Sequence, residues 1–177
     1  MYVDFRTTVL STVLLLSFLL ITHRAEALDT NHNISVGAGI PYGFIGVNYG
    51  FEMNLTNTFA IIPSVAVGTT ITAGASSEIG LSMLFRGKNE RIRYGFSLWN
   101  GTNTVLKIGE STYVSEEGIT AGINLRLQLG ANKVHGIDFY VLQAITPTND
   151  ELEQKYSVKR KGLIPGRLFG TGYVYRF

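Results

Sequence analysis

Histidine is the side chain best suited to general acid–base chemistry near neutral pH, and the chain has three: His23, His32 and His135. His135 stands in the stretch Val-His-Gly-Ile-Asp, so no serine lies two residues away to form a nucleophile–base pair. His135 and Asp138 are three residues apart, which puts them on opposite faces of a strand and makes them a poor metal pair. Cysteine is absent, which excludes disulfides and thiolate metal sites. The sequence predicts no catalytic residue, no metal site and no cofactor.

Charged side chains offer a second kind of chemistry. Arg126 and Asp138 lie on consecutive predicted strands, and a short turn at 131–133 sets them roughly opposite each other on the same face. A buried ion pair for packing is the favoured interpretation, and a gate or a proton path is the alternative. The predicted charge network consists of Glu52, Arg91, Arg93, Arg126 and Asp138.

The elements that position these residues are stretches in which apolar and polar residues alternate, the pattern of half-buried β-strands. Eight such strands are predicted, at 33–41, 44–53, 58–68, 77–86, 91–100, 118–129, 135–146 and from Arg167 to the C-terminus. Pro63 falls inside the third strand, where it cannot donate a ladder hydrogen bond, and it predicts a bulge or a shifted register there.

The connectors between the predicted strands alternate in length. Short, turn-rich connectors are predicted at 54–57, 87–90 and 130–134, and longer ones at 69–76, 101–117 and 147–163. The first connector, the tight turn Pro41-Tyr42-Gly43 after an outward Ile40, breaks the alternation. Such alternation is typical of an up-and-down barrel with both termini on one side of a membrane, where short turns meet the periplasm and longer loops lie outside.

Residues 1–27 have the layout of a secretory signal peptide. Arg6 precedes an apolar run from Val9 to Ile21, and the segment ends in Ala25-Glu26-Ala27. The apolar run is shorter than the roughly 20 residues that a membrane-spanning helix needs. We expect cleavage before Leu28, with residues 28–177 as a single domain. The formal net charge of +2 is too small for a nucleic-acid binder.

The C-terminal stretch puts Tyr173, Tyr175 and Phe177 on one face of the last strand. This ending resembles the closing strand of bacterial outer-membrane β-barrels, where the pattern is the signal that the barrel-assembly machinery reads. With the signal peptide, the chain resembles small eight-stranded outer-membrane proteins, the general type of the OmpA transmembrane domain and its smaller relatives. The resemblance implies an all-β fold, an eight-stranded antiparallel up-and-down transmembrane barrel, present as a monomer in the bacterial outer membrane.

Every predicted strand has one large apolar face and one face of glycine, small polar residues and charges. The apolar face must be the outer one, because an arginine or lysine at the bilayer midplane costs roughly 2–4 kcal/mol. An eight-stranded barrel leaves an interior just wide enough for side chains to fill. We therefore expect a plugged lumen that contains the charge network.

The resemblance implies a non-enzymatic barrel with a structural or surface-interaction role. A lipid A-modifying enzyme, a narrow pore and a soluble exported ligand-binding barrel stay open as alternatives. Basic residues in the predicted loop 147–163 would bind lipopolysaccharide phosphates as point charges, or form an ordinary solvated loop. They are Lys155, Lys159, Arg160 and Lys161.

Overall fold

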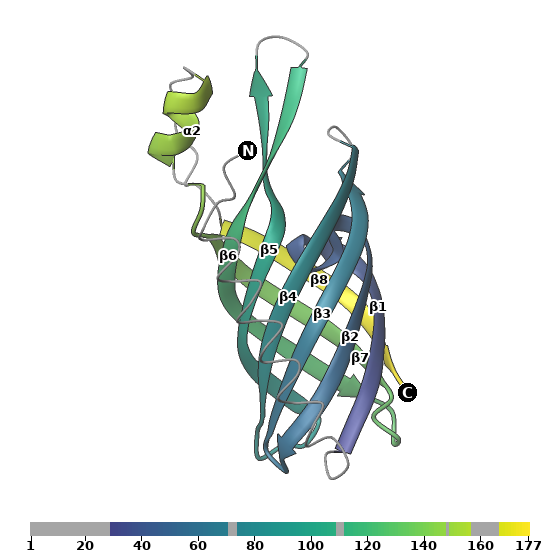
Figure 1. Cartoon of the computed structure of the whole chain (residues 1–177). Coiled ribbons are helices and arrows are strands. Elements are labelled where there is room, and N and C mark those ends of the chain that lie inside the picture. The colour runs from purple at the N-terminus through teal and green to yellow at the C-terminus, as the bar shows by residue number, and fades with distance from the viewer. Residues whose placement is uncertain (1–28, 71–73, 109–111, 148, 157–166) are drawn as a thin grey trace.

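The computed structural model describes residues 29–70, 74–108, 112–147, 149–156 and 167–177; the predicted signal peptide, 1–27, lies outside them. The described chain forms a closed barrel of eight antiparallel strands in sequence order, and β1 pairs with β8 to close it (Figure 1). The strands are β1 (Asp29–Gly39), β2 (Phe44–Thr56), β3 (Phe59–Thr70), β4 (Gly74–Arg86), β5 (Ile92–Ile108), β6 (Thr112–Leu129), β7 (His135–Ala144) and β8 (Arg167–Arg176). The predicted all-β, up-and-down barrel is confirmed.

The two ends of the barrel differ. The β2–β3, β4–β5 and β6–β7 connectors are short and lie at the end where β8 finishes, which we call the turn end. At the opposite end, the loop end, β5 and β6 continue past the barrel as a projecting hairpin beside α2 (Asn149–Tyr156) (Figure 1). Among the described residues, no helix is long and apolar enough to cross a membrane.

Two of the longer connectors are more ordered than the sequence predicts. Most of the predicted loop 101–117 is strand, with pairing that continues to Ile108 and Thr112 after a register shift between Thr102 and Thr104. Beyond the barrel neither face of this ribbon needs to be apolar, so the alternation that reveals a strand is missing. The predicted loop 147–163 contains α2, which has acidic residues in its first turn and Lys155 in its last, the arrangement that a helix dipole favours.

The first connector is the largest correction to the sequence-based layout. Ile40–Tyr42 form a short 3-10 helix, η2, whose three residues are all buried, so Ile40 does not face outward as predicted. Gly43 ends η2 in the left-handed conformation, with φ of 58°. The Asn48 side chain donates to the carbonyl of Pro41 at 2.7 Å, and Ser76 donates to that of Gly43 at 2.7 Å. This connector is short because it folds into the barrel.

Pro63 sits in β3 without a bulge. It is the Cα partner of Leu81 on β4, in an uninterrupted register. On the β2 side the ladder has Gly50 opposite Ser64 and Met53 opposite Ile61, with no pairs between them and no change of register. The missing N–H is therefore accommodated by a local gap in the β2–β3 ladder, and the bulge or shifted register predicted at this position is wrong.

Candidate functional site

The outer wall of the barrel is apolar on every strand. On β3, Val67 is 64% exposed while its neighbour Ala66 is 2% exposed, and on β5 Phe96 is 57% exposed beside Ser97 at 3%. One exposed member from each strand illustrates the pattern: Val36, Val47, Val67, Ile79, Phe96, Ile123, Val141 and Tyr173. An apolar surface that runs around a whole molecule marks contact with lipid or with a partner, because soluble monomers rarely expose large apolar patches.

Aromatic rings gather on this wall at the turn end. The rings of Phe59 and Phe85 stack with centroids 4.9 Å apart, and Tyr94 continues the row 6.4 Å from Phe85. Tyr175 and Phe177 stack at 5.9 Å near the seam between β1 and β8. A rim of this kind suits the boundary between hydrocarbon and water, where amphipathic rings concentrate.

Both histidines of the described chain belong to the same rim. Nδ1 of His32 lies 2.6 Å from the Tyr49 hydroxyl, and its ring stacks on Phe177 at 5.6 Å. Nδ1 of His135 lies 2.5 Å from the Tyr173 hydroxyl. In the part of the chain that the structure describes, neither histidine is hydrogen-bonded to a serine or a carboxylate. These contacts place the histidines on the wall rather than in a nucleophile–base arrangement.

The loop end of the lumen is filled by an apolar plug. Tyr140 lies edge-on to both Tyr42 and Trp99, with ring centroids 6.2 and 6.4 Å away. Glycines make room for these rings, since a Cβ at Gly172 would lie 2.3 Å from the Tyr42 ring and one at Gly80 would lie 2.3 Å from Trp99. The buried core cluster consists of Ile40, Tyr42, Ala66, Trp99, Tyr140 and Leu142.

The turn end of the lumen holds a cluster of charges centred on Glu52, which is fully buried. Oε1 of Glu52 accepts from Nη1 of Arg93 at 2.5 Å and lies 3.6 Å from Nη1 of Arg176. Oε2 lies 3.4 Å from Nη1 of Arg126. One carboxylate thus contacts three guanidinium groups that come from three different strands.

Arg126 and Asp138 form the second part of the cluster. They are Cα partners across β6 and β7, and the guanidinium donates to both carboxylate oxygens, at 2.7 and 2.8 Å. Such a fork is among the stronger side-chain interactions. The Tyr140 hydroxyl donates to Asp138 at 3.2 Å, so the charge cluster and the apolar plug are joined.

The cluster differs from the predicted network at two residues. Arg91 lies in the turn before β5, where its side chain is exposed. Its backbone amide donates to Oδ1 of Asn89 at 3.0 Å, and its backbone carbonyl accepts from the amide of Gln128 at 2.7 Å. The sequence-based boundary started β5 one residue too early, which turned Arg91 inward. Arg176 joins instead. The alternation of the last strand predicts that Arg176 faces the lumen near the periplasm, but the sequence does not predict its contact with Glu52.

The predicted basic cluster is described only at Lys155, because Lys159, Arg160 and Lys161 lie outside the described residues. Nζ of Lys155 donates to both oxygens of Glu116, at 2.8 and 3.0 Å, and the Tyr156 hydroxyl donates to Glu116 as well. The hydrogen bond to Glu116 raises the pKa of Lys155. Burial acts to raise the pKa of Glu116, but the hydrogen bonds from Lys155 and Tyr156 outweigh it and bring that pKa below its usual value. Lys155 is therefore tied to the β6 ribbon.

The described part of the chain has no evident metal site. Among the described residues, no group of three or more histidine, aspartate and glutamate side chains is placed to hold a metal ion.

Comparison with known proteins finds similar folds only. No protein-family model matches the sequence, and no curated protein is significantly similar to it. The N-terminal β-barrel domain of Pseudomonas aeruginosa OprF is 12% identical with a TM-score of 0.42, over 84% of this chain and 96% of that one. The Yersinia pestis outer membrane protein Ail, in a phospholipid bilayer nanodisc, is 17% identical with a TM-score of 0.44, over 84% of this chain and 100% of that one. The strand pairing of the chain itself, rather than these likenesses, establishes the barrel.

Proposed function

We propose that the chain is an outer-membrane protein whose barrel wall is embedded in lipid, with a structural or surface-contact role in the bacterial envelope and no enzymatic activity. The observation that carries this proposal is the inverted arrangement of side chains. Apolar residues cover the outside on all strands, whereas Glu52, Arg93 and Asp138 are buried inside at 0%, 2% and 2% exposure. A closed barrel is also one of the two ways in which a chain can satisfy its backbone groups within hydrocarbon.

The turn end of the barrel lies on the periplasmic side in this proposal. Short connectors are typical of the periplasmic ends of bacterial barrels, and longer ones of the outer surface. The rim of stacked rings, represented by Phe59, Phe85 and Tyr94, then sits at the inner boundary of the membrane. The β5–β6 hairpin and α2 extend outward, where they offer the surface for contact with other molecules.

The lumen does not conduct in this proposal. The apolar plug and the charge cluster occupy successive levels of an interior that eight strands leave only just wide enough for side chains. Planar-bilayer recordings distinguish this role from that of a narrow pore. We expect no unitary conductance from the refolded protein, and steady single-channel steps would favour the pore.

Lipid A modification is disfavoured by the positions of the histidines. His32 and His135 belong to the turn-end rim, and both use Nδ1 for a tyrosine hydroxyl. A lipid A-modifying site would need its base at the outer leaflet. Expression of the protein in a bacterial host should leave the lipid A mass spectrum unchanged, and a new lipid A species would overturn the non-enzymatic role.

Lipopolysaccharide remains the proposed partner of the loop end, through Lys155, Lys159, Arg160 and Lys161. The support for this partner is the clustering of basic residues beside a membrane whose outer leaflet carries phosphate groups. Because Lys155 already pairs with Glu116, we expect its substitution to change lipopolysaccharide binding less than substitution of the other three.

The whole proposal is tested by fractionation of cells that express the full chain, followed by gels run with and without heating. A membrane-embedded barrel stays in the outer-membrane pellet and changes its mobility on boiling. A protein that is released without detergent, with equal mobility in both lanes, would be the soluble exported barrel instead.

A further inference from the structure

The β4–β5 turn carries exposed positive charge at the turn end of the barrel. Lys88 and Arg91 are both exposed, and among the described residues neither is ion-paired with a carboxylate. The one acidic residue of this turn, Glu90, is paired with Lys133 of the β6–β7 turn. The hydrogen bond from Lys133 is the main reason that the pKa of Glu90 is lowered. The charges of Lys88 and Arg91 are therefore not balanced within the turn.

Hydrogen bonds hold this turn in one shape. The amide of Gly87 donates to the carbonyl of Ile92 at 3.1 Å, and the amide of Ile92 donates to the carbonyl of Asn89 at 2.9 Å. The Asn89 side chain accepts from the amide of Arg91 at 3.0 Å. An ordered backbone loses little conformational entropy on binding, so the turn presents its two cations at a low entropic cost.

The aromatic rim sets the depth of the turn in the membrane. Phe85 and Tyr94 are Cα partners, and their ring centroids are 6.4 Å apart on the wall. Lys88 follows Phe85 by three residues, and Arg91 precedes Tyr94 by three. Three residues of a tilted strand cover roughly 7 Å along the membrane normal, and each headgroup layer is roughly 5–8 Å thick. With the rings at the edge of the hydrocarbon, both cations therefore lie among the headgroups.

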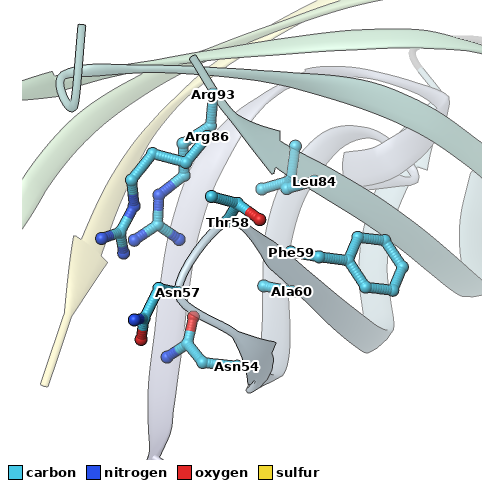
Figure 2. Close-up of a pocket in the computed structure, with 8 residues that line it drawn as sticks. All are labelled: Asn54, Asn57, Thr58, Phe59, Ala60, Leu84, Arg86 and Arg93. Carbon is cyan, nitrogen blue, oxygen red and sulfur yellow. The ribbon is translucent and has the colours of Figure 1, made fainter. Parts of the chain in front are cut away.

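The other short turns do not provide comparable charge. Residues 54–58 of the β2–β3 connection are uncharged, and Lys133 is already ion-paired. Arg86 and Arg93 are Cα partners, and their side chains extend to the side opposite the ring of Phe59, toward the lumen (Figure 2). Among the described residues, unbalanced positive charge at headgroup depth is thus concentrated on one flank of the barrel, at β4 and β5.

We propose that this flank binds anionic phospholipids of the periplasmic leaflet, with Lys88 and Arg91 at the lipid phosphate and the rings of Phe85 and Tyr94 against the acyl chains. Attraction between anionic lipids and a basic residue near the membrane surface raises affinity about fivefold per residue. Lys88 meets a phosphate as a point charge, whereas Arg91 offers a fork of donors. A zwitterionic headgroup also carries a positive charge, so it gains less. The proposal rests on the membrane-embedded barrel and adds the lipid class at one flank.

The test is tryptophan quenching by lipids that carry bromine on the acyl chains close to the headgroup. In the full mature chain, Tyr94→Trp/Trp99→Phe places the single tryptophan on the rim beside the turn. This protein is refolded in phosphatidylcholine vesicles that contain a small fraction of brominated phosphatidylglycerol or of brominated phosphatidylcholine. Equal quenching should need about fivefold less of the phosphatidylglycerol, and this preference should shrink as salt is added.

Two charge variants and a second reporter complete the test. In the same background, Lys88→Gln/Arg91→Gln should bring the two lipids to within about 1.5-fold of each other, because the attraction by the two cations is lost. Lys88→Arg/Arg91→Lys keeps both charges and should retain the preference. The second reporter is Tyr175→Trp/Trp99→Phe, which lies on β8, four strands away from β4 in the closed sheet. We expect it to show no preference.

Three outcomes would overturn the lipid site and leave the embedded barrel intact. They are equal quenching by the two lipids at the Tyr94→Trp reporter, the same preference at both reporters, and a preference that survives Lys88→Gln/Arg91→Gln. Absence of quenching by either lipid at both reporters would contradict the embedded barrel, and the lipid site with it.

Discussion

Replacement of Glu52 by glutamine should destabilise the barrel more than any other single substitution of a lumen carboxylate. Glu52 is fully buried and is the acceptor shared by Arg93, Arg126 and Arg176. In Glu52→Gln, Arg126 keeps its paired hydrogen bonds with Asp138, and Arg176 stays partly exposed to solvent. Arg93, in contrast, loses the one carboxylate with which it pairs in the described structure. Breaking a buried ion pair by removing one partner costs about 3–5 kcal/mol, because a charge stays buried without compensation.

The assay is urea unfolding of the protein refolded in lipid vesicles, followed by tryptophan fluorescence. The chain has one tryptophan, and Trp99 is buried in the plug, so the signal reports loss of the lumen packing. Glu90→Gln is the control, since Glu90 is exposed in a turn and its pairing with Lys133 should contribute little. The double variant Glu52→Gln/Arg93→Gln should regain part of the loss, because it removes the uncompensated guanidinium.

Two outcomes would refute this reasoning. A Glu52→Gln protein within about 0.5 kcal/mol of the parent would mean that the arginines are solvated or paired elsewhere. A double variant less stable than the sum of the two single substitutions would mean that Arg93 stabilises the barrel without Glu52.

Three further predictions concern the plug, the seam and the outer helix. Gly80→Ala should lower the free energy of unfolding by about 1–3 kcal/mol and shift the Trp99 emission, because the new Cβ would lie 2.3 Å from the indole. Gly87→Ala is the control: its Cβ would have no contact below 3.5 Å, so stability and emission should stay unchanged. Phe177 pairs through its backbone with His32, at 2.8 and 2.9 Å. Deletion of Phe177 should greatly lower the yield of heat-shifted barrel in cells, but should lower the yield of purified chain refolded into detergent much less. Equal losses in the two yields would argue against an assembly signal. The contact between α2 and Glu116 should persist at neutral pH and be lost as acid protonates Glu116, because the pKa of that carboxyl is lowered in the folded state. The rate of amide hydrogen exchange in α2 should therefore rise in acid in the parent protein. In Glu116→Gln it should be high at both neutral and acidic pH.

The barrel was predictable from the sequence because an apolar outer wall around a filled interior imposes a strict alternation. Val65 and Val67 point outward, and Ser64 and Ala66 inward, because the side chains of a strand alternate at every residue. The same regularity places Arg126 opposite Asp138, since a short turn fixes the register of a hairpin. These features depend on local pattern and turn length, which a sequence shows directly.

The features that the sequence concealed depend on contacts between distant segments. The packing of η2 inside the lumen depends on contacts with several strands. Gly172 on β8 leaves space for the Tyr42 ring, Asn48 on β2 donates to the carbonyl of Pro41, and Tyr140 on β7 packs against both Tyr42 and Trp99. The three arginines around Glu52 meet only because the sheet closes. The part of β5 and β6 that projects beyond the barrel was not predicted as strand, because neither of its faces has to be apolar and its sequence therefore does not alternate.

Fluorescence quenching by brominated lipid chains tests the inverted arrangement most directly. Trp99 in the native protein lies in the lumen, at 1% exposure, whereas Phe96 on the same strand is 57% exposed on the wall. In vesicles of brominated phosphatidylcholine, the native protein should keep most of its tryptophan emission, and the double variant Trp99→Phe/Phe96→Trp should lose most of it. Strong quenching of Trp99 in the native protein, or no quenching in the double variant, would contradict a barrel with lipid outside and a lumen filled by side chains.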